Sequence, residues 1–312
     1  MKKHFTTGCL LLGIACAGAA YTQEYPAKTI RLVTSPIGGG NDFPARLIAL
    51  ALAGPLGQQI VVDNRPTVLI ADIVAKSPPD GYTLLLSGSA HWLGPLFEKV
   101  NYDPVRDFAA LTLVDRSPNV LVVHPSLPAK NVKDMVALAK ARPGEINVAV
   151  GGPGSSNYVA AVLFEHMAGV KLTRIPYKGN APALTALLSG EIQVMFSSAG
   201  AVAPHMQSGR LRALGVSSPQ PSPLAPGVPP IASAGVPGYA AEVLHAMFAP
   251  AKTPAAIASK LNTEVGRYLR SAQAKDIFLK AGIEPSPSTP DELVAIMNAE
   301  VARMGRVLKA AK

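Results

Sequence analysis

Short apolar runs alternate with segments of helical period along this chain. β-Branched runs bounded by turn residues predict strands at 29–34, 59–63, 82–87, 120–124, 146–150, 191–197 and 211–216. Most of these runs are almost continuously apolar, which is typical of parallel strands that are covered on both faces.

Between the runs, apolar residues recur at helical spacing after a polar capping residue. The first such segment is 42–52, and Gly169 and Gly190 are expected to end two later helices. Helix N-caps are expected at Asn131, at Ser155 or Ser156, at Asn180, at Thr253 and at Thr289. This alternation of strands and helices predicts an α/β fold of mostly parallel sheets flanked by helices.

The first 24 residues are not expected to belong to this fold. Lys2 and Lys3 precede an uncharged apolar stretch, and Ala17-Gly18-Ala19 offers a signal-peptidase site. The pattern predicts a signal peptide over residues 1–20, cleaved near Ala19. A membrane anchor, or a lipoprotein modified at Cys16, is the alternative interpretation.

Both cysteines of the chain, Cys9 and Cys16, lie in this leader. The exported chain would therefore have no disulfide, no thiol nucleophile and no thiolate metal site. No other apolar run approaches the length of a membrane-spanning helix, so the mature protein is expected outside the cytoplasm, in the periplasm.

Composition and charge argue against two further classes of protein. With 48% hydrophobic and 16% charged residues, the chain is not expected to be disordered, and 312 residues are enough for two domains. The net charge is +9, or +7 without the two leader lysines, and the basic residues are dispersed. This dispersal argues against a nucleic-acid surface. Seven prolines between Ser217 and Gly238 mark a candidate segment crossing between domains.

Two glycine-rich loops, 35–42 and 151–157, each follow a predicted strand and open a predicted helix. Glycine lets the backbone approach a ligand closely, and the free N–H groups of a first helical turn favour an anion such as a carboxylate. The alternative is a tight turn that binds nothing. The candidate binding residues in these loops are Gly38, Gly39, Gly40, Asn41 and Asp42 in the first, and Gly154, Ser155, Ser156 and Asn157 in the second.

Other polar positions carry weaker signals. Ser89, in a loop after another predicted strand, offers a hydroxyl donor, and Ser197 ends a further strand; both are kept as candidate ligand residues. For Asp42, capping of the helix is the alternative to ligand binding. For loop 177–180, ligand binding and a purely structural turn likewise both stay open.

Evidence for catalysis is poor. The six histidines show neither H-x-x-x-H nor H-E-x-x-H spacing, and no G-x-S-x-G elbow is present. We therefore expect no catalytic residue, no metal and no cofactor. A triad dispersed over the chain stays open as an alternative.

Short motifs along the whole mature chain resemble one known family. They include Pro36 with Gly38-Gly39-Gly40 and Asp42, Asn64-Arg65-Pro66, Pro79-Asp80-Gly81-Tyr82, Pro176-Tyr177-Lys178-Gly179, Gly235-Val236-Pro237-Gly238-Tyr239, and Ala249-Pro250 with Thr253-Pro254. Their number and order resemble the periplasmic substrate-binding proteins of tripartite tricarboxylate transporters, the Bug family.

The resemblance implies a two-lobed periplasmic binding protein, a type II-like clamshell. Lobe 1 would comprise residues 21–124 and 226–312, and lobe 2 residues 125–225. A small carboxylate would lie between the lobes against both glycine loops, and the closed, monomeric protein would deliver it to membrane transporter subunits.

The chain departs from the family pattern at three places. Only 67–72 separates Pro66 from Ile73-Val74-Ala75-Lys76, where the family usually has a longer glycine-rich run. Asn157 stands where a histidine is common, and Leu244 and Ala246 replace the usual tryptophan and glycine. Two other functions remain open: the ligand-binding lobe of a signalling system, and a secreted α/β hydrolase.

Overall fold

The computed structural model describes residues 25–37, 40–152 and 155–310. The predicted signal peptide with both cysteines, and the candidate residues Gly38, Gly39 and Gly154, lie outside these ranges. Within the described ranges, no helix is both long and apolar enough to cross a membrane.

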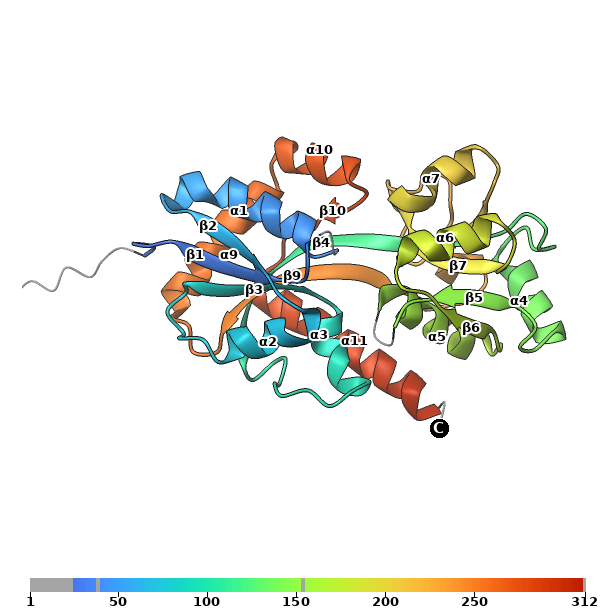
Figure 1. Cartoon of the computed structure of the whole chain (residues 1–312), viewed down its shortest axis with the longest axis horizontal. Helices are drawn as coiled ribbons and strands as arrows, with labels where there is room; N and C mark the ends of the chain where they lie inside the picture. Colours follow the sequence, from blue (N-terminus) through green and yellow to red (C-terminus); the bar gives the residue numbers. More distant parts are fainter. Residues whose placement is uncertain (1–24, 38–39, 153–154, 311–312) are drawn as a thin grey trace, which may run out of the picture.

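Lobe 1 is built on a sheet with helices on both faces (Figure 1). At its centre, β1 (Ile30–Thr34) pairs in parallel with β2 (Ile60–Asn64) and with β3 (Thr83–Gly88). Other elements of this lobe are α1 (Asp42–Leu56), α2 (Thr67–Ala75), α3 (Ala90–Leu93), η1 (Gly94–Leu96), α9 (Ala255–Leu269), α10 (Ala272–Lys280), β10 (Glu284–Pro285) and α11 (Pro290–Ala310).

The alternation of side chains along these strands explains their continuous apolar sequence. On β3, Leu84 and Leu86 join the cluster containing α1 and α9, whereas Leu85 joins the cluster containing α2 and α11. Successive residues of a strand point to opposite faces, so a sheet covered on both sides needs apolar residues at every position.

Lobe 2 repeats this plan. Its central strand β5 (Asn147–Val150) pairs in parallel with β6 (Thr173–Pro176) and β7 (Val194–Ser198). The remaining elements are α4 (Val132–Ala141), α5 (Ser156–Ala168), α6 (Asn180–Leu188), α7 (Ala199–Gln207), β8 (Arg212–Val216) and α8 (Ile231–Ala234).

Two long strands, β4 (Phe108–Val123) and β9 (Glu242–Pro250), join the lobes (Figure 1). β4 pairs antiparallel with β9 from Phe108 to Pro118, and then with β7 from Asn119 to Val123. The predicted strand 120–124 is thus only the end of a 16-residue strand. β6 and β9 were not predicted. β6 pairs in parallel with β5, whereas β9 pairs antiparallel with β3 and β4 and makes the sheet mixed.

We propose that the two boundaries between the lobes lie within β4 and at the start of β9, instead of after residues 124 and 225. β4 changes partners between Pro118 and Asn119. On the return path, Tyr239 still donates a hydrogen bond to the carbonyl oxygen of Ala160 in α5, at 2.8 Å. The proline-rich segment therefore packs on lobe 2, and β9 makes the second crossing.

The predicted helix caps have mixed outcomes. Asn131 accepts a hydrogen bond from the Asp134 amide at 2.9 Å, and Thr289 and Glu292 form the reciprocal capping box, so both predictions are confirmed. The cap at Asn180 is wrong because Gly179, with φ of 103°, holds that position. The cap at Thr253 is also wrong because its hydroxyl donates to the Pro250 carbonyl and the helix begins two residues later.

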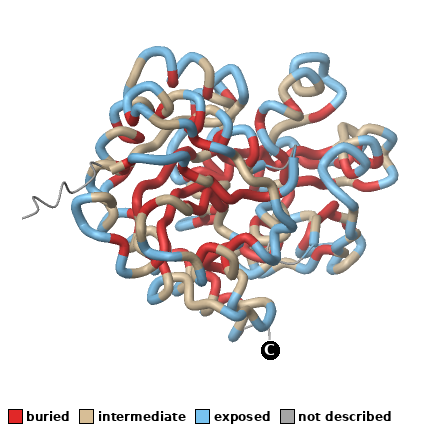
Figure 2. Tube along the Cα trace, turned by 60° about the vertical axis from the view of Figure 1, so that its left-hand side comes forward, coloured by how far each residue is buried: buried red, intermediate tan, exposed pale blue. Residues whose placement is uncertain are grey.

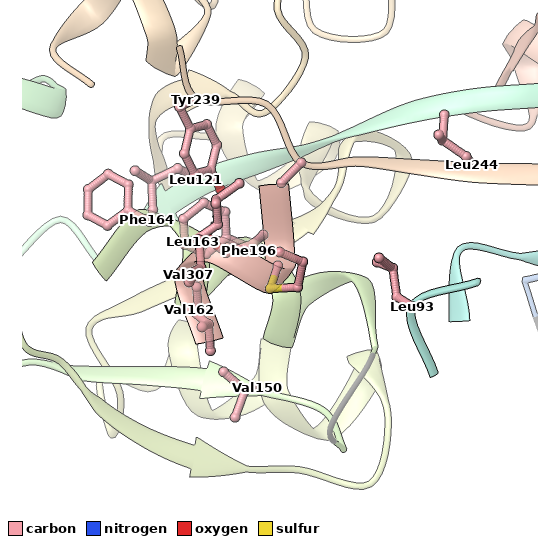
Figure 3. Packing of buried hydrophobic residues seen from close by; sticks show 14 of the residues in the cluster. Leu93, Leu121, Val150, Val162, Leu163, Phe164, Phe196, Tyr239, Leu244 and Val307 are labelled. Atoms are coloured by element: carbon pink, nitrogen blue, oxygen red, sulfur yellow. The ribbon is translucent and has the colours of Figure 1, made fainter. Parts of the chain in front are cut away.

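The buried residues follow the strands of both lobes, as the red segments of Figure 2 show. One apolar cluster extends from lobe 1 into lobe 2. It brings Val307 of α11 together with Phe164 of α5, Phe196 of β7 and Tyr239, the group drawn in Figure 3. α11 therefore contributes to the cores of both lobes.

Trp92, the single tryptophan of the chain, ties α3 to α11. Its side chain is buried, and its Nε1 donates a hydrogen bond to Glu300 Oε2 at 2.7 Å. Burial raises the pKa of Glu300, although Trp92 and Arg303 partly oppose this shift.

We expect Trp92→Phe to lower the free energy of unfolding by about 2 kcal/mol, because it leaves a buried carboxyl oxygen without its donor. Denaturant titration followed by circular dichroism measures this, since the variant has no tryptophan to report. In a double-mutant cycle with Glu300→Met, which has no strong acceptor, a coupling energy near zero would contradict the assigned hydrogen bond.

Candidate functional site

A cleft of about 1140 Å³ lies between the lobes. Lobe 1 contributes Gly40, Phe43 and Pro44 from the start of α1, and 281–283 before β10. Lobe 2 contributes the ends of β5, β6 and β7 with the loops that follow them. Because the carboxyl ends of parallel strands meet at one edge of a sheet, these loops converge although they are distant in sequence.

Four helices begin at this cleft. Its walls include Gly40 just before α1, Ser155 and Ser156 at α5, Gly179 and Asn180 at α6, and Ser198 and Gly200 at α7. The first-turn N–H groups of a helix lack intrahelical partners and carry partial positive charge. Among the described lining residues, Lys178 and His245 are the basic ones, and none is acidic. The cleft is therefore suited to an anion.

The second glycine loop is held in place by Asn157. Its Oδ1 accepts hydrogen bonds from the Gly151 amide at 3.1 Å, the Ser155 hydroxyl at 2.8 Å and the Tyr158 amide at 2.9 Å. Ser155, Ser156 and Asn157 all line the cleft. Asn157 thus stabilises the conformation of this loop.

The first glycine loop ends at Asp42, whose side chain contacts the neighbouring strand β2. This buried carboxylate accepts from Asn64 Nδ2 at 2.8 Å and pairs with Arg46 Nε at 3.0 Å. Asp42 is the first residue of α1, whose N-cap is Asn41. Its side chain joins the end of β2 to α1 and is not among the described residues lining the cleft.

The two remaining candidates, Ser89 and Ser197, have different positions. Ser89 precedes α3 and lines a smaller cavity beside the cleft. Ser197 is buried, its hydroxyl donates to Asn180 Oδ1 at 3.1 Å, and it does not line the cleft. Because successive residues of a strand point to opposite faces, Ser198 lines the cleft instead, and a ligand-binding role for Ser197 stays a prediction.

The strands that join the lobes form the floor of the cleft, which sequence reasoning missed. Ser117 and Asn119 of β4 and Val243 and His245 of β9 line it, each at alternate positions of its strand. Asn119 is 2% exposed, and its buried Nδ2 has no hydrogen-bond partner in the described structure. Two isolated polar residues in the apolar run of β9, Glu242 and His245, were the only sequence signal that this segment contributes to a site.

His245 is held by a buried carboxylate. Its Nδ1 lies 2.7 Å from Oδ1 of Asp115, a fully buried residue directly opposite on β4. Because a carboxylate accepts hydrogen bonds, Nδ1 is the donor in this contact. Nε2 is directed at the first loop: a Cβ added to Gly40 would lie 3.5 Å from it.

The shortened segment after Pro66 does not contribute to the cleft. It forms α2, which begins immediately after Pro66. Residues 67–72 line a separate cavity of about 200 Å³ together with His91. In the described ranges, no group of histidine, cysteine, aspartate or glutamate side chains is arranged to hold a metal ion.

The sequence model of the family described as "Tripartite tricarboxylate transporter family receptor" matches residues 44–312. The chain belongs to this receptor family. The receptor is 36% identical over 306 residues to Protein BugT of Bordetella pertussis, an alignment that covers 95% of this chain and 94% of BugT.

Solved structures agree with this assignment. An R. palustris protein solved with adipate is 35% identical, with a TM-score of 0.79 over 92% of this receptor and 98% of that chain. MatC from Rhodopseudomonas palustris, solved with bound malate, is 29% identical, with a TM-score of 0.76 over 91% of this receptor and 99% of that chain. The predicted family and the two-lobed α/β fold are thus confirmed.

Proposed function

We propose that this receptor is a periplasmic solute-binding protein that captures a small carboxylate between its lobes and delivers it to a tripartite tricarboxylate-type membrane transporter. The observation that carries the proposal is the convergence of four helix N-termini on a cleft lined by no described acidic side chain. Such N-termini bind carboxylates through backbone N–H groups. The adipate and malate of two similar proteins support the same ligand class.

Ligand capture would couple to closure of the lobes. A ligand that touches the start of α1 on one side and of α5, α6 and α7 on the other gains its full set of contacts only in the closed form, and so shifts the equilibrium towards it. β4 and β9 are the connections about which the lobes would move. The closed monomer, exported by the predicted signal peptide, would then present one surface to the transporter. Membership of the transporter receptor family favours this partner over a signalling system.

The proposal includes no catalytic step. Asp115 and His245 resemble two members of a hydrolytic triad, but Nε2 of His245 hydrogen-bonds to no serine of the described chain. A hydrolase would need a nucleophile there. We therefore assign the pair to ligand recognition.

A panel of carboxylates tests the proposed function. At ten times its dissociation constant, a ligand is expected to add about 1.4 kcal/mol to the free energy of unfolding, seen as a rise in melting temperature. Succinate, malate, aspartate, adipate and 2-aminoadipate form the core of the panel, with the matched amides as controls that lack the carboxylate. If no acid raises the melting temperature while an ester is hydrolysed, the proposal is overturned in favour of the hydrolase.

A further inference from the structure

Three polar residues of the cleft floor, Ser117, Asn119 and Ser198, lie where β4 passes from one lobe to the other. Ser117 and Asn119 occupy alternate positions of β4, so their side chains share the face that lines the cleft. Asn119 lies directly opposite Ser198 on β7, whereas Ser117 lies directly opposite Val243 on β9. The floor at Asn119 is therefore polar on two neighbouring strands.

The backbone of Asn119 is held by Ser217, a fully buried residue that follows β8. The Asn119 amide donates a hydrogen bond to Ser217 Oγ at 2.8 Å, and the Asn119 carbonyl oxygen accepts one from the Ser217 amide at 2.8 Å. The Ser217 hydroxyl donates in turn to the carbonyl oxygen of Ala241, just before β9, at 2.7 Å. These contacts fix the backbone from which the Asn119 side chain projects, so little conformational freedom is lost when a ligand binds it.

The side-chain amide of Asn119 holds an unused donor. The residue is 2% exposed, and its buried Nδ2 has no hydrogen-bond partner within the described chain. A buried N–H group without an acceptor destabilises the fold, whereas an apolar side chain of the same shape does not carry this cost. Asparagine is thus an unfavourable residue for stability alone, and its place on the floor of the cleft points to a ligand as the missing acceptor.

Resting on the proposed function, we propose that Asn119 is a ligand-binding residue whose Nδ2 donates a hydrogen bond to an oxygen atom of the bound carboxylate ligand. An amide N–H pairs with a carboxylate, carbonyl or hydroxyl oxygen and gains nothing from a hydrocarbon group. The hydroxyl of Ser198 forms no capping hydrogen bond at the start of α7, so it is available to donate to the same oxygen. The floor would thereby add a third contact to those of the helix N-termini on either side.

Asn119→Leu tests this proposal, because leucine has nearly the size of asparagine and no donor. Isothermal titration calorimetry with succinate, malate and adipate measures the affinity. We expect roughly tenfold weaker binding of each acid that binds the wild type, the loss of one hydrogen bond to a charged or polar oxygen. Without any acid, the melting temperature should equal or exceed that of the wild type, because the unpaired donor is removed. Unchanged affinity in the folded variant would overturn the proposal.

Asn119→Asp tests the direction of the hydrogen bond. Ionised aspartate has the shape of asparagine but offers acceptors only, so we expect a loss of affinity at least as large as in Asn119→Leu. Wild-type or tighter binding by folded Asn119→Asp would overturn the assignment, since the ligand would then be the donor. Melting curves check that both variants are folded, and Asn119→Leu decides alone if Asn119→Asp is not.

Asn298→Leu is the matched control, because Asn298 is exposed on α11 and does not line the cleft. It should keep the wild-type affinity for each acid. Equal losses in Asn298→Leu and Asn119→Leu would contradict a specific contact at Asn119. Failure of every acid of the panel to bind the wild type would overturn the proposed function itself, which separates that outcome from a failure at Asn119 alone.

Discussion

Replacing Gly151 by valine should abolish carboxylate binding while leaving the protein folded. A Cβ at this position would lie 2.7 Å from Ser155 Oγ and 3.1 Å from Asn157 Oδ1. The branched side chain would push Ser155 away and break the contacts that Asn157 makes across the loop. We expect at least a hundredfold loss of affinity, about 2.8 kcal/mol, for any acid that binds the wild type.

Calorimetry with the best ligand of the panel measures this loss, and circular dichroism checks the fold. Gly305→Val in α11 is the matched control, because no atom lies within 4 Å of an added Cβ there and Gly305 does not line the cleft. Valine has a higher helix propensity than glycine, so the control is not expected to weaken the helix. Wild-type affinity in Gly151→Val would show that this loop does not hold the ligand.

Acidification should destabilise the protein through His91. This side chain is 2% exposed, stacks on Tyr102 at 5.2 Å and meets Phe108 and Phe248 at 4.5 and 4.7 Å. Burial lowers its pKa from 6.5 to about 3, an effect that the neighbouring Pro104 backbone only partly offsets. The imidazole ring is therefore uncharged and buried in the core, and it does not bind a ligand in the cleft.

The sign of the effect follows from proton linkage. Between pH 6.5 and 3 the unfolded chain binds a proton at His91 and the folded chain does not, so stability falls as the pH falls. From pH 7 to pH 4, His91 alone should lower the free energy of unfolding by about 3 kcal/mol. Denaturant titrations at the two pH values measure the loss in the wild type and in His91→Phe, which should lose correspondingly less.

His166→Phe is the control for this comparison, because His166 is exposed near the end of α5. It should retain the wild-type pH dependence. If His91→Phe and the wild type lose equal stability between pH 7 and pH 4, His91 is not held neutral by the core.

Much of the fold was predictable from local sequence. The strands of the parallel pairs β1, β2, β3, β5 and β7 were found to within a few residues, because burial on both faces leaves an apolar run that no solvent-facing position interrupts. The helix start at Thr289 was found because a capping box is a contact between residues three positions apart. By contrast, β9 escaped because Glu242 and His245 break its pattern.

The cleft was predictable only in part. Ser155, Ser156, Asn157 and Gly40 were expected to bind, and the structure places them on its walls. Asn119 and His245 were missed, since each is an isolated polar residue in a strand and no motif marks it. Ser197 was predicted to bind the ligand, but its neighbour Ser198 lines the cleft. Successive residues of a strand point to opposite faces, so an error of one residue selects the wrong face.

The sequence by itself determined the α/β class, the family and the two loops that open helices, because all three depend on residues near one another in the chain. The tertiary structure alone decided which helix starts share one cleft and which polar side chains form its floor. Asp115 and His245 are 130 residues apart, and Trp92 and Glu300 are 208 apart. Such pairs arise only when strands and helices pack, since the physical reason for each contact is the burial of both partners, and burial is a property of the folded chain.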